Sequence, residues 1–190
     1  MNNVKKMDLE LKQIENADPI SSKILENTKN AMGMIPNMYS TMANNPALLD
    51  SYIYSYKSFR QNAGFSSQEQ EVIFLAISFE NGCKYCMAAH SFIADKMSNL
   101  PEEITNAIRN NTDISDFKLQ ALSVFTTQML EKRGLPSQED INAFLEAGYT
   151  ENHILGVITA LGIKTMSNYI NHVFNIPVDD AFKSRAWVKQ

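Results

Sequence analysis

Apolar side chains recur every three or four residues along most of the chain, which is the spacing of one face of an α-helix. Asn45-Pro46 opens one such segment, which continues to Phe59. Ser66 and Glu69 form a capping-box signature that opens the next segment, which runs to about residue 81. The apolar run inside that segment has no polar face, so the sequence predicts a helix that is buried on every side.

Further start and stop signals divide the rest of the chain into helices. The predicted helices include one that follows Gly82, others that start at Pro101 and at Ser137, one over 114–132, and one from Thr150 to Phe174. No segment alternates like a β-strand over enough residues to outweigh the helical pattern. We therefore expect an all-α fold of roughly eight to ten helices joined by short loops.

Composition and charge narrow the class of protein. The chain has 190 residues, 44% of them hydrophobic, and no repeat or long linker, which predicts a single domain over residues 1–190. Its 17 basic and 21 acidic residues give a net charge of −4, which argues against a nucleic-acid partner. The sequence shows no signal peptide and no apolar stretch of membrane-spanning length, so we expect a cytoplasmic protein with no membrane partner.

The chain contains two cysteines, Cys83 and Cys86, which is too few for a disulfide-built scaffold. With His90 they occupy positions i, i+3 and i+7, so on a helix all three lie along one face. If the helix begins near Gly82, both thiols lie in its first turns, where the helix dipole and free backbone N–H groups stabilise a thiolate. Lys84 adds a nearby positive charge.

His90 can accept the proton of the Cys86 thiol if a carboxylate orients it. The helices before and after Gly82 are close in sequence, and an antiparallel arrangement would bring Glu71 near His90. Glu80 is the alternative carboxylate, but its place beside the turn directs it towards solvent.

Other uses of a C-x-x-C pair fit this sequence less well. A c-type haem needs a histidine directly after the second cysteine, and position 87 is methionine. A thioredoxin motif needs a strand before the helix, and a structural zinc site needs four ligands where this segment offers three. The remaining alternative is a pair of cysteines packed in the core. Glu71 and His90 favour a redox site, without a metal or an organic cofactor.

The spacing of these residues resembles that of a known family. Glu71, eleven residues, and then Cys83, Cys86 and His90 in the pattern C-x-x-C-x-x-x-H are similar to the redox motif of the carboxymuconolactone decarboxylase-like family, and within it of the AhpD-like alkylhydroperoxidases. The similarity covers about residues 20–180, which is the core of the domain that it implies. It also implies an all-helical AhpD-like fold and a homo-oligomer, commonly a trimer or hexamer.

The resemblance also implies a role for each residue of the motif. Cys86 is the peroxidatic cysteine, Cys83 is the resolving cysteine, and Glu71 acts as the base through His90. An external dithiol, a lipoylated protein being one example, reduces the resulting disulfide. Tyr85 occupies a position where peroxidases of the family often carry histidine. A phenol with a pKa near ~10 is a poor base, although its hydroxyl can donate a hydrogen bond to a thiolate or a leaving oxygen.

The sequence therefore predicts a thiol-dependent peroxidase that reduces hydroperoxides through a Cys83/Cys86 dithiol–disulfide cycle. One alternative is a lactone enzyme of the decarboxylase branch, with His90 as its acid and base. Another is a non-catalytic, redox-sensing helical oligomer.

Two groups of residues near the C-terminus are assigned structural roles. We expect Asn168 and Asn171 to make hydrogen bonds in helix contacts or interfaces rather than to take part in catalysis. We expect Phe182 and Trp187 to pack across subunits, because aromatic side chains in a tail would otherwise stay in contact with water.

Overall fold

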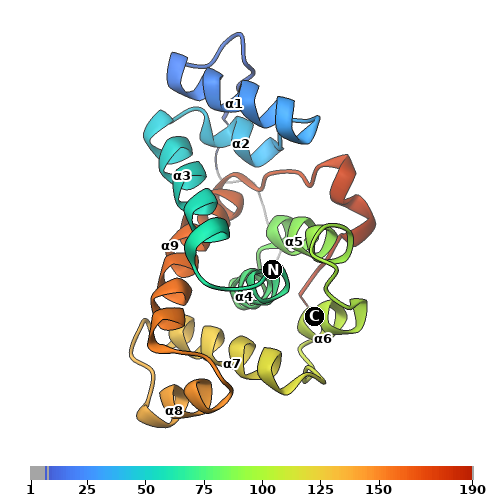
Figure 1. The fold of residues 1–190 in the computed structure, drawn as a ribbon. Helices are drawn as coiled ribbons and strands as arrows, with labels where there is room; N and C mark the ends of the chain where they lie inside the picture. The colour runs from blue at the N-terminus through green and yellow to red at the C-terminus, as the bar shows by residue number, and fades with distance from the viewer. Residues whose placement is uncertain (1–6, 8, 190) are drawn as a thin grey trace.

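A computed structural model describes residue 7 and residues 9–189. These residues form nine α-helices and one 3₁₀ helix and contain no β-strand, so the predicted all-α class is confirmed (Figure 1). The helices are α1 (Pro19–Met32), α2 (Asn37–Met42), α3 (Pro46–Asn62), α4 (Ser67–Glu80), α5 (Lys84–Lys96), α6 (Glu102–Asn110), α7 (Phe117–Glu131), α8 (Gln138–Glu146), α9 (Glu151–Phe174) and η1 (Asp180–Arg185). Among the described residues, no helix combines the length and the apolar character needed to cross a membrane.

The helix starts with the clearest capping signals lie where the sequence predicts them. The side chain of Asn45 accepts a hydrogen bond from the backbone N–H of Leu48 and so caps α3. At α4, Ser66 and Glu69 form both hydrogen bonds of a capping box, each satisfying a backbone donor that the first turn leaves free. These caps are local, which is why the sequence alone reveals them.

The predicted start of α7 at residue 114 is wrong, because the helix begins at Phe117. Asp116 caps the helix by accepting a hydrogen bond from the N–H of Leu119. The side chain of Gln120 reaches back to accept the N–H of Ile114, which keeps that residue in the preceding loop. Helices α1 and α2 also lie outside the segments that the hydrophobic pattern singles out.

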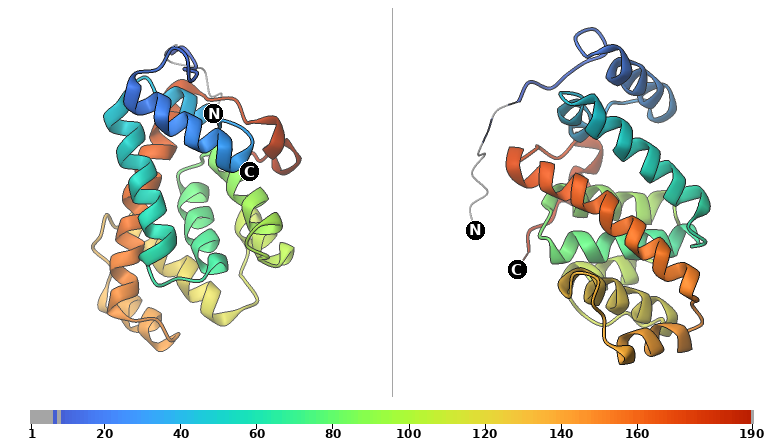
Figure 2. Two further views of the ribbon diagram at one scale, coloured as in Figure 1. Left: turned by 45° about the horizontal axis from the view of Figure 1, so that its top comes forward. Right: turned by 90° about the vertical axis from the view of Figure 1, so that its left-hand side faces the viewer.

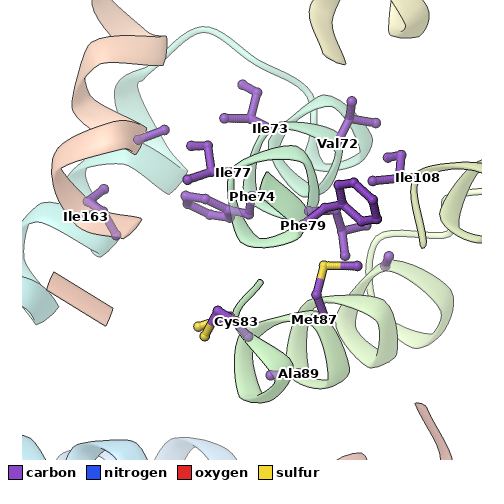
Figure 3. Close-up of a cluster of buried hydrophobic side chains, with 14 of the residues drawn as sticks. Val72, Ile73, Phe74, Ile77, Phe79, Cys83, Met87, Ala89, Ile108 and Ile163 are labelled. Atoms are coloured by element: carbon purple, nitrogen blue, oxygen red, sulfur yellow. The ribbon is translucent and has the colours of Figure 1, made fainter. Parts of the chain in front are cut away.

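Helix α4 lies at the centre of the molecule, with α5, α6, α7 and α9 packed around it (Figure 1). Every side chain from Glu69 to Phe79 is buried, as its apolar pattern predicts. Figure 3 shows Phe74 and Ile77 on the side of α4 that faces Ile163 of α9. The side chain of Met87 of α5 points towards Phe79, at the end of α4. This central helix positions the residues of the candidate site.

The turn between α4 and α5 depends on Gly82, whose φ of 66° lies in the left-handed region that favours glycine. The backbone N–H of Cys83 donates to the carbonyl of Ser78 across this turn, at 2.9 Å. The chain therefore reverses within a few residues, and α5 packs along α4.

Helix α9 runs diagonally across one side of the molecule and contacts α3, α4 and α5 (Figure 2). At Gly156, an added Cβ would lie 2.7 Å from the ring of Phe65 and 3.1 Å from the carbonyl of Ala63. Glycine at this position therefore allows α9 to approach the loop after α3. The same helix carries buried polar residues towards the interior, of which Lys164, Asn168 and Asn171 are described below.

The segment that follows α9 returns across α5 and α6 (Figure 2). The prediction that Phe182 and Trp187 pack across subunits is wrong, because they are only 6% and 9% exposed within their own chain. The indole N–H of Trp187 donates to the carbonyl of Arg109 of α6, and its ring lies against Phe79 of α4. The tail thus covers the core of its own chain.

Candidate active site

Helices α4 and α5 bring Glu71 and His90 into contact, as their spacing predicts. The Nδ1 atom of His90 lies 2.9 Å from Oε2 of Glu71, and both side chains are buried. Arg60 from α3 approaches the other carboxylate oxygen, with its Nη2 atom 2.5 Å from Oε1 of Glu71. The carboxylate is therefore held between an imidazole and a guanidinium group.

The surroundings of the Glu71–His90 pair change the pKa of both groups. Burial alone would raise the pKa of Glu71, but the adjacent His90 and Arg60 outweigh it and lower this pKa, so the carboxylate is ionised. Burial and the positive charge of Lys164 lower the pKa of His90, so its imidazole is neutral at neutral pH. A neutral imidazole that donates its Nδ1 proton to Glu71 has Nε2 as its proton acceptor.

Arg60 is a site residue that sequence reasoning missed. It belongs to the last turn of α3, where its Nη2 atom also donates to the hydroxyl of Tyr56 at 2.6 Å. Its guanidinium group lies 4.9 Å from the ring centroid of Phe74. Its place one turn after Tyr56 on the apolar face of a helix is the one sign in the sequence that it points inwards.

Cys83 is the N-cap residue of α5, and Cys86 lies in the first turn, so the predicted position of both thiols at the start of this helix is confirmed. Both are free cysteines with exposed fractions of 0% and 2%. Burial and a hydrogen bond to Cys86 raise the pKa of Cys83. Burial would also raise the pKa of Cys86, but the hydrogen bond from Cys83 and the positive charge of Lys164 lower it instead. Cys86 is thus the more acidic thiol of the pair, and Cys83 is the less acidic one.

The two asparagines of α9 differ in what they contact. Asn168 makes the predicted helix contact, because its Oδ1 atom accepts a hydrogen bond from Asn81 at the end of α4. Asn171 instead reaches the candidate site, where its Nδ2 atom lies 3.4 Å from Sγ of Cys86 and 3.2 Å from Sδ of Met38. Asn171 is thus a further hydrogen-bond donor to the thiolate that sequence reasoning did not assign to the site.

Lys164 is a second residue of α9 that sequence reasoning missed. Only 1% of it is exposed, and its Nζ atom has no hydrogen-bond partner among the described residues. The ammonium group lies 5.4 Å from the ring centroid of Phe74, whose ring is also 4.8 Å from that of His90. A single lysine after a run of apolar residues, ending in Ile163, is the signal that could have indicated a buried charge.

Tyr85, the residue between the two cysteines, does not direct its hydroxyl group at a thiol. The hydroxyl donates to Oδ2 of Asp179 in the segment after α9. Burial and the negative charge of Asp179 raise the pKa of Tyr85 far above the ordinary value of a phenol. The alternative carboxylate, Glu80, is half-buried and pairs with Lys189 at 3.7 Å, away from His90.

The site lies within a segment that a family model recognises. The model of the carboxymuconolactone decarboxylase family matches residues 48–126, which contain Glu71, both cysteines and His90. This segment of the chain is therefore similar to that family. A search of curated proteins finds none that matches this chain.

Solved structures share the fold of this chain. A peroxidase-related protein with an AhpD core from Ralstonia eutropha JMP134 is 18% identical, with a TM-score of 0.83 over 96% of this chain and 97% of that chain. A peroxidase-related protein from Silicibacter sp. TM1040 is 19% identical, with a TM-score of 0.79 over 97% and 98% of the two chains. The debrominase Bmp8 is 17% identical in its complex with 2,3,4-tribromopyrrole, with a TM-score of 0.72 over 88% and 89%. The AhpD-like fold implied by the motif is thereby confirmed.

Within residue 7 and residues 9–189, the structure contains no cluster of metal-ligating side chains. No three histidine, cysteine, aspartate or glutamate side chains converge there in a way that could hold a metal ion. The chemistry available at the site is that of a thiolate, a second thiol, a neutral imidazole with a carboxylate behind it, and a buried ammonium group.

Proposed function

We propose that this protein is a thiol-dependent peroxidase that reduces hydroperoxides through Cys83 and Cys86. The observation that carries the proposal is the pair of free cysteines at the start of α5, where Asn171 lies 3.4 Å from Sγ of Cys86 and His90, in contact with Glu71, follows one turn later. Cleavage of a peroxide O–O bond takes two electrons, which is what two thiols supply on closing into a disulfide. The fold shared with peroxidase-related proteins and an AhpD core supports this assignment.

In the first step, the Cys86 thiolate attacks one oxygen of the hydroperoxide. The O–O bond breaks, an alkoxide or hydroxide leaves and takes up a proton, and Cys86 becomes a sulfenic acid. In the second step, Cys83 loses its proton and attacks the sulfur of Cys86, so the S–O bond breaks and water leaves as the S–S bond forms. His90, oriented by Glu71, is the base for this second proton.

An external dithiol must then reduce the disulfide for the enzyme to turn over. The two sulfur atoms lie almost fully inside the protein, which favours a slender reductant over a folded domain that presents its thiols on a flat surface. A lipoyl group attached to a carrier protein has this shape and brings two thiols on one arm. We further propose a cytoplasmic homo-oligomer, a trimer or hexamer, as its working form.

Peroxide consumption by the reduced protein tests the function. With dithiothreitol as reductant, we expect wild type to consume hydrogen peroxide and an organic hydroperoxide, and Cys86→Ser to consume neither. Cys83→Ser should react once and stop at the sulfenic acid of Cys86. His153→Ala, which removes an imidazole that caps α9 away from the thiols, is the matched control and should retain the rate.

Three outcomes would contradict the proposal in different ways. Consumption that survives Cys86→Ser would exclude Cys86 as the nucleophile. A disulfide that forms without turnover would favour the redox sensor. Thiols that stay reduced under excess peroxide would favour the lactone enzyme, for which turnover of a lactone substrate that is lost in His90→Ala is the corresponding assay.

A further inference from the structure

The side-chain amide of Asn171 lies in the protein interior, with partners for its nitrogen and none for its oxygen. Only 5% of the residue is exposed. Its Nδ2 atom donates to the carbonyl of Ser167 at 2.6 Å and lies 3.4 Å from Sγ of Cys86 and 3.2 Å from Sδ of Met38. Its Oδ1 atom has no hydrogen-bond partner among the described residues. A buried carbonyl oxygen of this kind is costly unless a donor reaches it.

The contacts of Asn171 determine which of its two polar atoms is the oxygen. A backbone carbonyl can only accept a hydrogen bond, so the atom next to the carbonyl of Ser167 must be the amide nitrogen. The sulfur atoms of a thiolate and of a thioether are also acceptors, so Cys86 and Met38 agree with this orientation. The atom without a partner is therefore the oxygen, which accepts from an O–H or N–H group.

Two carboxylates contact residues of the C-x-x-C-x-x-x-H motif, and neither has an oxygen left for a ligand. One oxygen of Glu71 contacts a guanidinium group and the other contacts the imidazole of His90. The oxygens of Asp179 accept hydrogen bonds from the hydroxyl of Tyr85 and from a backbone N–H. Of these three acidic or amide side chains, Asn171 alone keeps an oxygen that no donor or cation contacts within the described part of the chain.

The distances allow one substrate atom to contact both this oxygen and the sulfur of Cys86. The two polar atoms of an amide lie about 2.2 Å apart, so Oδ1 of Asn171 lies within about 6 Å of Sγ of Cys86. A hydroxyl group donates over about 2.8 Å. Two reacting atoms lie about 3–3.5 Å apart before their bond forms. A single oxygen atom can therefore donate to Oδ1 and face Sγ at the same time.

We propose that Oδ1 of Asn171 accepts the O–H of the hydroperoxide and so holds its terminal oxygen against Sγ of Cys86. This inference rests on the proposed function and adds a substrate-binding residue to it. A hydroperoxide fits because its terminal oxygen carries the proton that Oδ1 needs and belongs to the O–O bond that the thiolate breaks. Water carries such a proton but offers no bond that a thiolate can break.

The proposed hydrogen bond persists through the first step of the reaction. Sγ of Cys86 forms a bond to the terminal oxygen as the O–O bond breaks. The electron pair of that bond leaves with the alkoxide, which takes up one proton from solvent. The proton on the terminal oxygen stays where it is, because it becomes the O–H of the sulfenic acid. Asn171 therefore binds the same O–H group in the substrate and in the sulfenic acid.

Two reagents that consume the same thiolate separate substrate binding from thiolate formation. In a Cys83→Ser parent, Cys86 is the one remaining cysteine. Iodoacetamide alkylates it, and cumene hydroperoxide converts it to a sulfenic acid that dimedone labels. Both rates are proportional to the thiolate fraction of Cys86, so the ratio of the peroxide rate to the alkylation rate is independent of that fraction. Mass spectrometry of the labelled protein gives this ratio for the parent and for each variant.

Asn171→Leu should lower the ratio by about 10²-fold, the cost of misplacing a reacting group by about 1 Å. Asn171→Thr should lower it similarly, because its hydroxyl replaces the hydrogen bond to the carbonyl of Ser167 on a side chain too short to hold the substrate. Asn168→Leu is the matched control. It removes an amide that contacts Asn81 one turn earlier on α9, so the ratio should stay at the value of the parent.

The outcomes distinguish this inference from the proposed function. An unchanged ratio in a folded Asn171→Leu or Asn171→Thr variant would overturn the role of Asn171 and leave the peroxidase function intact. An equal loss in Asn168→Leu would overturn that role too, because it would reflect damage to α9. A parent that iodoacetamide alkylates but that forms no sulfenic acid would overturn both proposals. Circular dichroism of each variant checks that it is folded.

Discussion

Two pairs of a carboxylate and an aromatic ring lie along α5, and they differ in where the carboxylate comes from. Glu71, which contacts His90, belongs to the adjacent helix α4 and also pairs with Arg60. Asp179, which contacts Tyr85, belongs to the segment after α9, and its other oxygen accepts the backbone N–H of Asn37 at 3.0 Å.

The two pairs also differ in what they do with a proton. The imidazole of His90 is neutral and has a nitrogen that can take up a proton near neutral pH. The phenol of Tyr85 keeps its proton, because burial and Asp179 raise its pKa. A similar contact therefore leaves His90 able to take up a proton, whereas at Tyr85 it holds the C-terminal segment in place.

Glu71→Gln should produce the largest difference between the pairs. The amide cannot stabilise a protonated His90, so we expect the rate of peroxide consumption to fall by about 10²–10⁴-fold, the usual contribution of general base catalysis. The matched change Asp179→Asn should alter the rate by less than about tenfold, since Tyr85 transfers no proton. Similar losses in both variants would show that the pairs do not differ in function.

The pair of Glu71 and His90 should also contribute more to the free energy of unfolding than the pair of Asp179 and Tyr85. Glu71→Ala leaves the guanidinium group of Arg60 buried without its anion, so we expect the free energy of unfolding to fall by about 3–5 kcal/mol. Tyr85→Phe removes one hydrogen bond of Asp179, whose carboxylate still accepts the N–H of Asn37. The free energy of unfolding should therefore fall by about 1–3 kcal/mol. Urea unfolding measures both, and a larger loss in Tyr85→Phe would contradict this ranking.

Tyr85→His should make the second pair resemble the first. An imidazole in contact with Asp179 can accept a proton near neutral pH, whereas the phenol cannot. We expect peroxide consumption to rise by about tenfold or less, and the added Asp179→Asn change to cancel the gain. A rate that stays the same or falls would mean that proton transfer at this position does not limit turnover.

The pH dependence of stability should reveal the neutral state of His90. Its pKa in the folded protein is lowered, so the unfolded chain binds a proton near pH ~6.5 that the folded protein does not. Stability should therefore be full above that pH and fall as the pH decreases below it, by up to about 1.4 kcal/mol per pH unit. Glu71, whose pKa is also lowered, should add a further loss only in more acidic solution, as the pH falls through its folded value.

Unfolding by urea between about pH 8 and pH 3 checks this expectation. A His90→Gln variant should lose the first part of the pH dependence and keep the second. A wild-type protein that becomes more stable on acidification over this range would contradict a neutral, buried His90.

The parts of the site that the sequence reveals are those formed by neighbouring segments. The capping box of α4 and the turn at Gly82 determine how α4 and α5 pair, and this pairing brings Glu71 to His90. The register of Cys83 and Cys86 on α5 follows from helical periodicity in the same way.

The parts that the sequence does not reveal come from distant helices. Arg60 and Lys164 reach the site because α3 packs against α9 and α9 packs against α4, and no local pattern specifies that packing. The sequence predicts a subunit contact for Trp187 because a helical pattern does not indicate that a tail folds back on its own chain. A charged residue on the apolar face of a predicted helix, such as Arg60 or Lys164, is the sequence signal that indicates such a contact.

The hydrogen bonds of Asp179 have a consequence for biosynthesis. They join the C-terminal segment to Asn37 and Tyr85, which lie 142 and 94 positions earlier in the chain. A ribosome completes the first helices well before this segment emerges, so α4 and α5 spend that interval without α9 and the tail over them. During translation the two cysteines are therefore open to solvent oxidants, and their low-dielectric surroundings arise only once α9 and the segment after it have emerged and folded back.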